Sequence, residues 1–196
     1  VGFMARTGRD LSLVGLQSRQ SMQLESFRDL RIIPAVARRK RRSLLKDVEC
    51  WLDRQPFARM WTFTTGSRCN MFELRERLSW LHRKVSRLNA KSFMKKNGVS
   101  IVFRSTEFGE IEKAGDGALP TFHPHAHCLV KLAGKLSKAR WAEILNNVHE
   151  YWNHNWDESG RLKKSASEVV KYVAKPLDLL KLSGAELKYI QEEVVA

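Results

Sequence analysis

Three histidines alternate with other residues in a ten-residue stretch that otherwise resembles a buried β-strand. The stretch is Thr121-Phe-His-Pro-His-Ala-His-Cys-Leu-Val130. Successive side chains of a strand point to opposite faces, so we expect the three imidazoles on one face and their apolar neighbours on the other. Imidazoles that converge on one face can bind a metal ion or contact a phosphate. The alternative is a histidine-rich strand face that only packs or meets solvent. The histidines are His123, His125 and His127.

The charge balance points to a polyanionic partner. The chain carries 35 Lys and Arg against 21 Asp and Glu, a formal net charge of +14. This excess favours nucleic acid ahead of an acidic membrane surface. No run approaches the ~18 apolar residues that span a bilayer, and the first residues lack a signal-peptide core. We therefore predict a nucleic-acid partner, no membrane association and a cytoplasmic location.

The length of 196 residues, 43% of them apolar, is enough for one domain with its own core and an extension. Residues 1–50 are predicted to be a basic, partly helical N-terminal extension, and residues 51–196 the main domain. The three cysteines are scattered and form no CxxC, so they are expected to be free thiols in a reducing compartment. A chain that opens on Val1 is expected to be part of a longer protein.

Hydrophobic periodicity predicts a mixture of strands and helices. We expect residues 1–35 to be loosely ordered or peripheral. An Asn97-Gly98 turn signal precedes the second predicted strand. The strands are predicted at 58–65, 99–107 and 121–130, and the helices at 43–52, 73–93, 137–156, 165–175 and 183–194.

The second predicted strand ends on Glu107, and an antiparallel pairing with the histidine strand would bring this carboxylate beside His125 and His127. Two imidazole nitrogens and one carboxylate leave positions open on a divalent ion for water or a phosphate oxygen. With no thiolate nearby, the donor set suits Mn²⁺ or Mg²⁺ better than structural zinc. His123 is expected to support the site or to contact DNA. Glu107 could also be an ordinary charge at a strand end.

A third element is the predicted helix 165–175, which carries Glu168, Tyr172 and Lys175 at spacings of four and three. These spacings put the three side chains on one helical face. A tyrosine hydroxyl beside a lysine, aimed at a metal-bound phosphate, is a candidate nucleophile. Tyr172 could instead be a packing residue, and Glu168 could complete a capping box with Ser165.

These motifs together resemble the HUH endonucleases, and most closely the rolling-circle replication initiator (Rep) proteins of small plasmids. Trp61-Thr-Phe-Thr-Thr65 is similar to the first family motif, and His125-Ala-His127 to the metal-binding His-hydrophobic-His motif. Glu107 stands where the third ligand lies, and Tyr172-Val-Ala-Lys175 matches the YxxK motif. In one plasmid branch a glutamate precedes the tyrosine by four residues, as Glu168 does. The motifs span residues 58–180.

The resemblance implies an α+β fold, with a central antiparallel sheet that carries the histidines and helices on its faces. It also implies a metal-dependent, site-specific single-stranded DNA endonuclease and ligase that nicks a replication origin. Tyr172 would form a 5′-phosphotyrosine link, Lys175 would assist it, and Glu168 would activate the water that ends the cycle. Mn²⁺ or Mg²⁺ would be the cofactor. The implied partners are single-stranded or hairpin origin DNA, a host helicase and a polymerase.

Two departures and several alternatives qualify this interpretation. The residue between the two motif histidines is only Ala126, and no second tyrosine lies beside Tyr172, which disfavours a two-tyrosine mechanism. A single-tyrosine HUH transposase shares the motif order, whereas relaxases place the tyrosine before the histidines. A histidine-triad hydrolase is disfavoured by Pro124, because proline donates no ladder hydrogen bond. A basic nucleic-acid-binding protein without catalysis is the remaining alternative.

Overall fold

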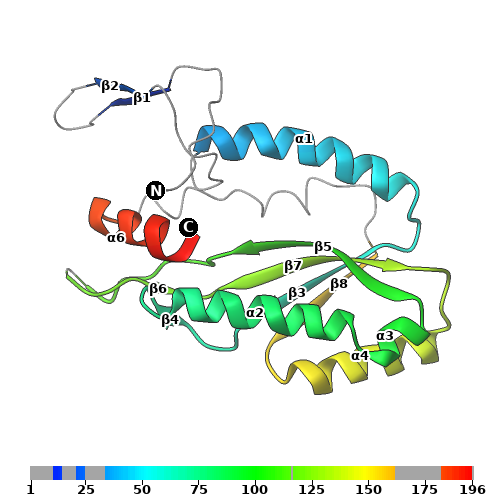
Figure 1. Ribbon diagram of the computed structural model, residues 1–196. Coiled ribbons are helices and arrows are strands. Elements are labelled where there is room, and N and C mark those ends of the chain that lie inside the picture. The colour runs from blue at the N-terminus through cyan, green and yellow to red at the C-terminus, as the bar shows by residue number, and fades with distance from the viewer. Residues whose placement is uncertain (1–10, 15–20, 25–33, 116, 162–181, 196) are drawn as a thin grey trace.

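The computed structural model describes residues 11–14, 21–24, 34–115, 117–161 and 182–195. Within them the chain is α+β, with a four-stranded antiparallel sheet that has helices on both of its faces (Figure 1). This confirms the predicted α+β class with an antiparallel sheet flanked by helices, while the HUH type of the fold stays a prediction. The strand order is β5-β7-β3-β8. The strands are β3 (Arg59–Thr64), β5 (Val99–Glu107), β7 (His125–Leu132) and β8 (Trp156–Arg161).

The histidine strand β7 lies inside this sheet, between β5 and β3. Its register puts His125 opposite Thr64 of β3 and opposite Glu107 of β5. The predicted antiparallel pairing of residues 99–107 with the histidine strand is therefore confirmed. An internal strand has both edges hydrogen-bonded, so its side chains are held in fixed positions relative to those of both neighbours.

One face of the sheet carries the main hydrophobic core. The strand residues Trp61 and Phe63 are fully buried there, beside Ala126, Cys128 and Val130. Helices α2 (Leu74–Asn89) and α4 (Lys138–Trp152) cover this face (Figure 1). The apolar stripe of α2 packs into the core as predicted, and its buried members are Leu74, Leu81, Val85 and Leu88.

The opposite face is covered at one end by α1 (Pro34–Asp53), which lies across the sheet in Figure 1. Val48 of α1 is buried against Met60 and Leu129, which alternate with the residues of the main core along their strands. The helix is longer than the predicted 43–52, and it crosses the proposed boundary at residue 50. The division into an extension and a main domain stays a prediction.

The predicted strand 121–130 is broken in two, which corrects the expectation of one continuous strand. Thr121–Phe122 forms β6, which pairs with β4 (Cys69–Asn70) in a separate two-stranded sheet. The main-sheet strand begins only at His125. The physical reason is Pro124, which has no N–H to donate to a ladder. His123 therefore lies outside β7, and only His125 and His127 share a face of that strand.

The predicted helix 73–93 is also divided. After α2 ends at Asn89, Lys91 has an extended backbone and a short helix α3 (Ser92–Lys96) follows. The side-chain amide of Asn89 donates to the Ile101 carbonyl at 3.1 Å and accepts from the Ile101 N–H at 2.7 Å. These two bonds tie the end of α2 to β5. The predicted turn at Asn97-Gly98 is confirmed, with Gly98 at φ +61°.

The predicted helix 137–156 ends early, and its last residues belong to a strand. Ser137 caps the start of α4, and the helix stops at Asn153, which has a left-handed φ of 53°. Trp156 begins β8, an edge strand that pairs with β3. Residues 156–161 include Asp, Glu, Ser and Gly, which are depleted in strands, so their pattern does not predict one. Pairing with β3 decides the conformation.

Two segments remain at the ends of the chain. Within residues 1–35, which were expected to be loosely ordered or peripheral, β1 (Leu11–Val14) and β2 (Ser21–Leu24) pair antiparallel in a two-stranded sheet of their own. The predicted capping box of Ser183 and Glu186 is present and opens α6 (Gly184–Tyr189), which continues as the π-helical segment Ile190–Val195. Among the described residues, no helix has the length and apolar character needed to cross a bilayer.

Candidate functional site

A row of polar side chains follows the cluster of Val48, Met60 and Leu129 on the sheet face where α1 lies. His127 on β7 lies opposite Thr62 of β3 and Ser105 of β5, and His125 lies opposite Thr64 and Glu107. Alternation along each strand puts all of these side chains on the same face as Met60 and Leu129. Thr64, Ser105 and His127 are buried even though they are polar. Sequence reasoning identified the two histidines and Glu107, but missed the threonines and the serine.

His127 is held through both of its ring nitrogens. Its Nε2 lies 3.1 Å from Oε1 of Glu107, and its Nδ1 lies 3.1 Å from Oγ1 of Thr62. Only 5% of the residue is exposed. When Nε2 carries the hydrogen, it donates to the carboxylate, which can only accept, and Nδ1 accepts from the threonine hydroxyl. If the threonine accepts from Nδ1–H instead, the lone pair of Nε2 becomes available as a metal ligand.

This pair has the spacing of two neighbouring metal ligands. Two cis donors that each lie about 2.1 Å from an octahedral ion are about 3 Å apart, close to the separation of Nε2 and Oε1. A nitrogen and a carboxylate oxygen suit Mn²⁺ or Mg²⁺. Within the part of the chain that the structure describes, however, no group of three His, Cys, Asp or Glu is arranged to hold an ion. Because 3.1 Å is also the length of an ordinary hydrogen bond, the divalent ion stays a prediction, with His125 as the predicted third ligand.

The three imidazoles form a row along this face. The ring centroids of His125 and His127 are 6.3 Å apart with nearly parallel planes, and those of His123 and His125 are 4.7 Å apart. His123 thus remains beside the other two histidines although it lies outside β7. Burial, and then the nearby Arg68, lower the pKa of His123, which favours its neutral form.

Gly109 lets the chain after β5 pass close to the histidines. Its φ is +73°, and a Cβ at this position would lie 2.1 Å from the carbonyl oxygen of His123 and 3.1 Å from Nδ1 of His125. Beside it, the N–H of His123 donates to the Phe108 carbonyl at 3.0 Å. Only glycine fits this conformation and this space. No sequence pattern around Gly109 predicted this role.

Arg68 fixes the segment on the other side of His123. Its Nε donates to Oγ1 of Thr121 at 3.0 Å, and its Nη2 donates to the carbonyls of Glu110 and Thr121 at 2.5 and 2.9 Å. Its Nη1 also pairs with Glu112 at 2.9 Å. The arginine therefore joins the end of β3, the loop after β5 and β6. A lone arginine after the Gly66-Ser67 turn gave no sequence signal for this role.

The predicted catalytic residues Tyr172, Glu168 and Lys175 lie outside the described residues, as do Ser165 and the rest of the predicted helix 165–175. Their assignment stays a prediction. The three cysteines are free, with Cys69 and Cys128 buried and Cys50 exposed. Burial raises the pKa of the Cys69 thiol to about 11 and that of Cys128 to about 12, so neither is a ready nucleophile or metal ligand at neutral pH.

Comparisons of the chain with protein families, with curated proteins and with solved structures found no match.

Proposed function

We propose that this protein is a metal-dependent endonuclease of the HUH type, which nicks single-stranded DNA at a replication origin and starts rolling-circle replication. Tyr172 is the proposed nucleophile, and Glu107, His125 and His127 are the proposed ligands of Mn²⁺ or Mg²⁺. Single-stranded or hairpin origin DNA is the proposed substrate. A host helicase and a polymerase are the proposed partners in the cell.

The contact between His127 and Glu107 is the observation that carries this proposal. The residues are 20 apart in sequence, yet Nε2 and Oε1 are 3.1 Å apart on adjacent strands. The contact joins the two motifs that were predicted to share a metal ion. A net charge of +14 supports a polyanionic substrate. When bound, the ion would withdraw charge from the scissile phosphate.

The proposed chemistry uses the chain's own residues as follows. The Tyr172 oxygen forms a bond to the scissile phosphorus as the bond from phosphorus to the 3′ oxygen breaks. The 3′ oxygen takes up a proton and becomes the hydroxyl that primes synthesis. Lys175 favours the phenolate, since an ordinary tyrosine, with a pKa of about 10, is mostly protonated at neutral pH. Glu168 later takes a proton from the water that makes the terminating cleavage. The water oxygen bonds to the scissile phosphorus as its bond to the 3′ oxygen breaks, so no second covalent link to the protein forms.

The test is a denaturing gel assay for covalent adducts, with single-stranded and hairpin oligonucleotides from the parent replicon, with Mn²⁺ or with chelator. We expect a Mn²⁺-dependent protein–DNA band. The chain has only three tyrosines, so Tyr151→Phe and Tyr189→Phe are matched controls that should keep the band that Tyr172→Phe loses. A band that persists in Tyr172→Phe would show that another group is the nucleophile.

The metal ligands are tested in the same assay. His127→Ala and His125→Ala should lose the adduct without rescue by added Mn²⁺, whereas His149→Ala, on the exposed side of α4, should keep it. Glu168→Ala should form the adduct but release it poorly. Loss of the band in every histidine variant, His149→Ala included, would argue against a specific metal site.

The alternatives give different results. A single-tyrosine transposase would form the same adduct but on transposon ends rather than on an origin. A basic nucleic-acid-binding protein without catalysis would bind the oligonucleotides and form no adduct under any condition.

A further inference from the structure

A pocket of about 200 Å³ lies far from the histidines. It opens beside Arg59, the first residue of β3, whereas His125 pairs with Thr64 at the other end of that strand. Arg59 alternates with Trp61 and Phe63, so the pocket is on the α4 side of the sheet and the histidines are on the α1 side. The pocket is therefore separate from the candidate metal site.

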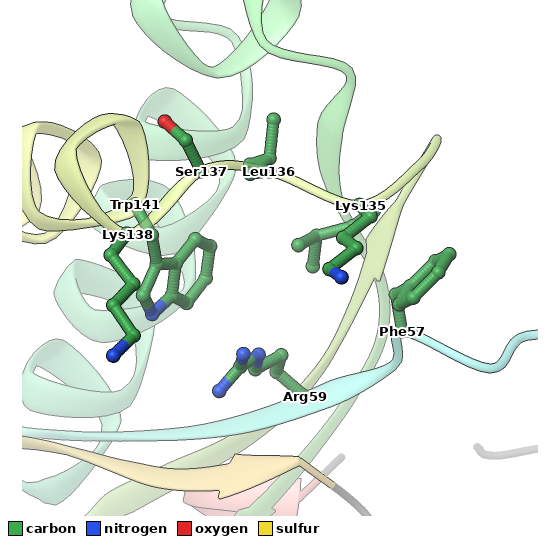
Figure 2. Close-up of a pocket in the computed structure, with 8 residues that line it drawn as sticks. Phe57, Arg59, Lys135, Leu136, Ser137, Lys138 and Trp141 are labelled. Atoms are coloured by element: carbon green, nitrogen blue, oxygen red, sulfur yellow. The ribbon is translucent and has the colours of Figure 1, made fainter.

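Aromatic and cationic side chains surround this pocket (Figure 2). Trp141 of α4 lies on one side and Phe57, just before β3, lies on the other, with Arg59 and Lys135 between them. The indole of Trp141 is held in place: its centroid is 6.0 Å from that of Trp61, and the Arg59 guanidinium lies 4.7 Å over its ring. Because the guanidinium lies over this ring, a ligand that stacks on the indole on that side must take the place of the Arg59 guanidinium.

The charge of the pocket is positive. Arg59, Lys135 and Lys138 line it, and none of the described residues that line it is acidic. Arg59 is partly neutralised by Glu158, 2.9 Å from its Nη1. Lys135 and Lys138 are exposed and form no ion pair with a described residue. Two lysines are therefore available for an anionic ligand.

The size of the pocket limits what can enter it. Pockets for drug-sized ligands are typically about 300–1,000 Å³, and this one is smaller. It fits one planar group, while the rest of the ligand stays outside. A planar apolar group next to negative charges is the chemistry of one base and its neighbouring phosphates in a single strand, which proteins bind by combining aromatic stacking with basic residues.

We propose that this pocket is a second binding site for single-stranded DNA, in which one base takes the place of the Arg59 guanidinium on the Trp141 ring and the adjoining phosphates contact Lys135 and Lys138. Arg59 keeps its ion pair with Glu158. The choice of DNA as the ligand rests on the proposed function. The site anchors the strand at a distance from the scissile phosphate, without sequence preference, because every base has an aromatic face.

The charge contacts are tested by fluorescence anisotropy with a short labelled oligothymidylate, without divalent ions. The double variant Lys135→Gln/Lys138→Gln should weaken binding about tenfold, and the slope of log K against log salt should fall by about 1.4, or about 0.7 for each lost phosphate contact. Lys95→Gln/Lys96→Gln makes the same charge change on neighbouring α3, outside the pocket, and should leave the slope nearly unchanged. An equal loss in both double variants would overturn the proposal.

Stacking is tested at Trp141. Trp141→Leu should bind the oligothymidylate about tenfold more weakly, and Trp141→Phe should retain most of the affinity. An oligonucleotide of abasic sites should bind the normal protein and Trp141→Leu equally, because it has no base to stack. Melting curves show whether Trp141→Leu folds; if it does not, the comparison of the two lysine double variants decides the question. Unchanged affinity in folded Trp141→Leu would overturn the proposal.

The adduct assay separates this proposal from the proposed function. Pocket variants that lose affinity while the normal protein forms no adduct would support the pocket and reject the nuclease. Normal oligothymidylate binding in every pocket variant, with adduct formation intact, would reject the pocket alone.

Discussion

The two faces of the four-stranded sheet differ in composition although they are made by the same strands. On the α2 and α4 face, β3 and β7 present Trp61, Phe63, Ala126, Cys128 and Val130, and helices cover them fully. On the α1 face, a small cluster around Met60 and Leu129 gives way to threonines, Ser105, Glu107 and the histidines. The first face resembles an ordinary core, while the second is half core and half candidate site.

Alternate residues of one strand therefore serve different purposes: those on the first face stabilise the fold, and those on the second face form the candidate site. Burial of apolar area on the first face contributes most of the stability, at roughly 25 cal/mol per Å². The polar row on the second face contributes less, because buried polar groups must be hydrogen-bonded to offset their desolvation. The strand ladder holds both sets rigidly. Substitutions on the first face should therefore affect folding, and those on the second should affect ligand binding.

The largest effect is expected for Phe63→Ala. Phe63 is fully buried and contacts Trp61, Trp152 and Trp156, with ring centroids 4.3 Å apart for the pair with Trp152. The free energy of unfolding should fall by about 3–5 kcal/mol in urea denaturation. Phe72→Ala is the control, because Phe72 is 59% exposed, and should cost about 1 kcal/mol or less. If both variants lost a similar amount of unfolding free energy, the buried core on this face would not contribute more stability than the exposed Phe72.

Gly109→Ala should produce the next largest effect. The positive φ and the approach to the His123 carbonyl should cost about 2–3 kcal/mol in unfolding free energy and should also weaken Mn²⁺ binding. Gly115→Ala in the same loop is the control, since no atom lies within 4 Å of its Cβ position. It should be neutral or slightly stabilising. If Gly109→Ala is as stable as Gly115→Ala, the backbone near Gly109 has room for a Cβ beside the His123 carbonyl.

Thr62→Val should separate binding from stability. It removes the hydroxyl 3.1 Å from Nδ1 of His127 and keeps the shape of the side chain. Mn²⁺ affinity, measured by calorimetry, should fall about 10- to 100-fold. The unfolding free energy should change by roughly 1 kcal/mol, the value of one hydrogen bond. Thr62→Ser keeps the hydroxyl and should keep the affinity; a loss in Thr62→Ser as large as in Thr62→Val would point to packing instead.

The smallest effect is a pH dependence that originates near the first face. Burial, and then Arg104, lower the pKa of His82, whose Nε2 lies 3.0 Å from Oγ1 of Thr106. The unfolded state then binds more protons than the folded state below about pH 6.5, so stability should fall as the pH decreases through and below that value. Urea titrations from pH 7.5 to about 5 should show this slope, and it should be shallower in His82→Gln. An unchanged slope would exclude His82 as a source, leaving His123 and His154, whose pKa values are also lowered.

Elements with a strong pattern were predicted well, and those that depend on pairing were not. Val99–Glu107 and the apolar stripe of α2 follow directly from β-branched residues and helical spacing. The break at Pro124 was not predicted, because three alternating histidines suggested one continuous strand. Strand β8 was missed because its polar residues have low strand propensity, and only the edge of β3 stabilises them in this conformation.

The candidate site likewise contains residues that the sequence predicted and residues that it did not. Its titratable residues were visible, because His125, His127 and Glu107 are unusual at the ends of apolar strands. Their supports were not visible: Thr62, Gly109 and Arg68 act through the antiparallel register and through loop contacts that join residues far apart in sequence.

Residue types and their spacing are enough to show which side chains alternate along each strand, where the helices place their apolar stripes, and that the chain carries a large positive charge. These properties are local, since they depend on residue type and on the fixed periods of helix and strand. Only the tertiary structure decided that β7 lies between β5 and β3, that Glu107 meets His127, and that Trp141 and Lys135 enclose a second pocket at the opposite end of the sheet. Such contacts depend on register and packing, which the residues of one segment do not specify alone.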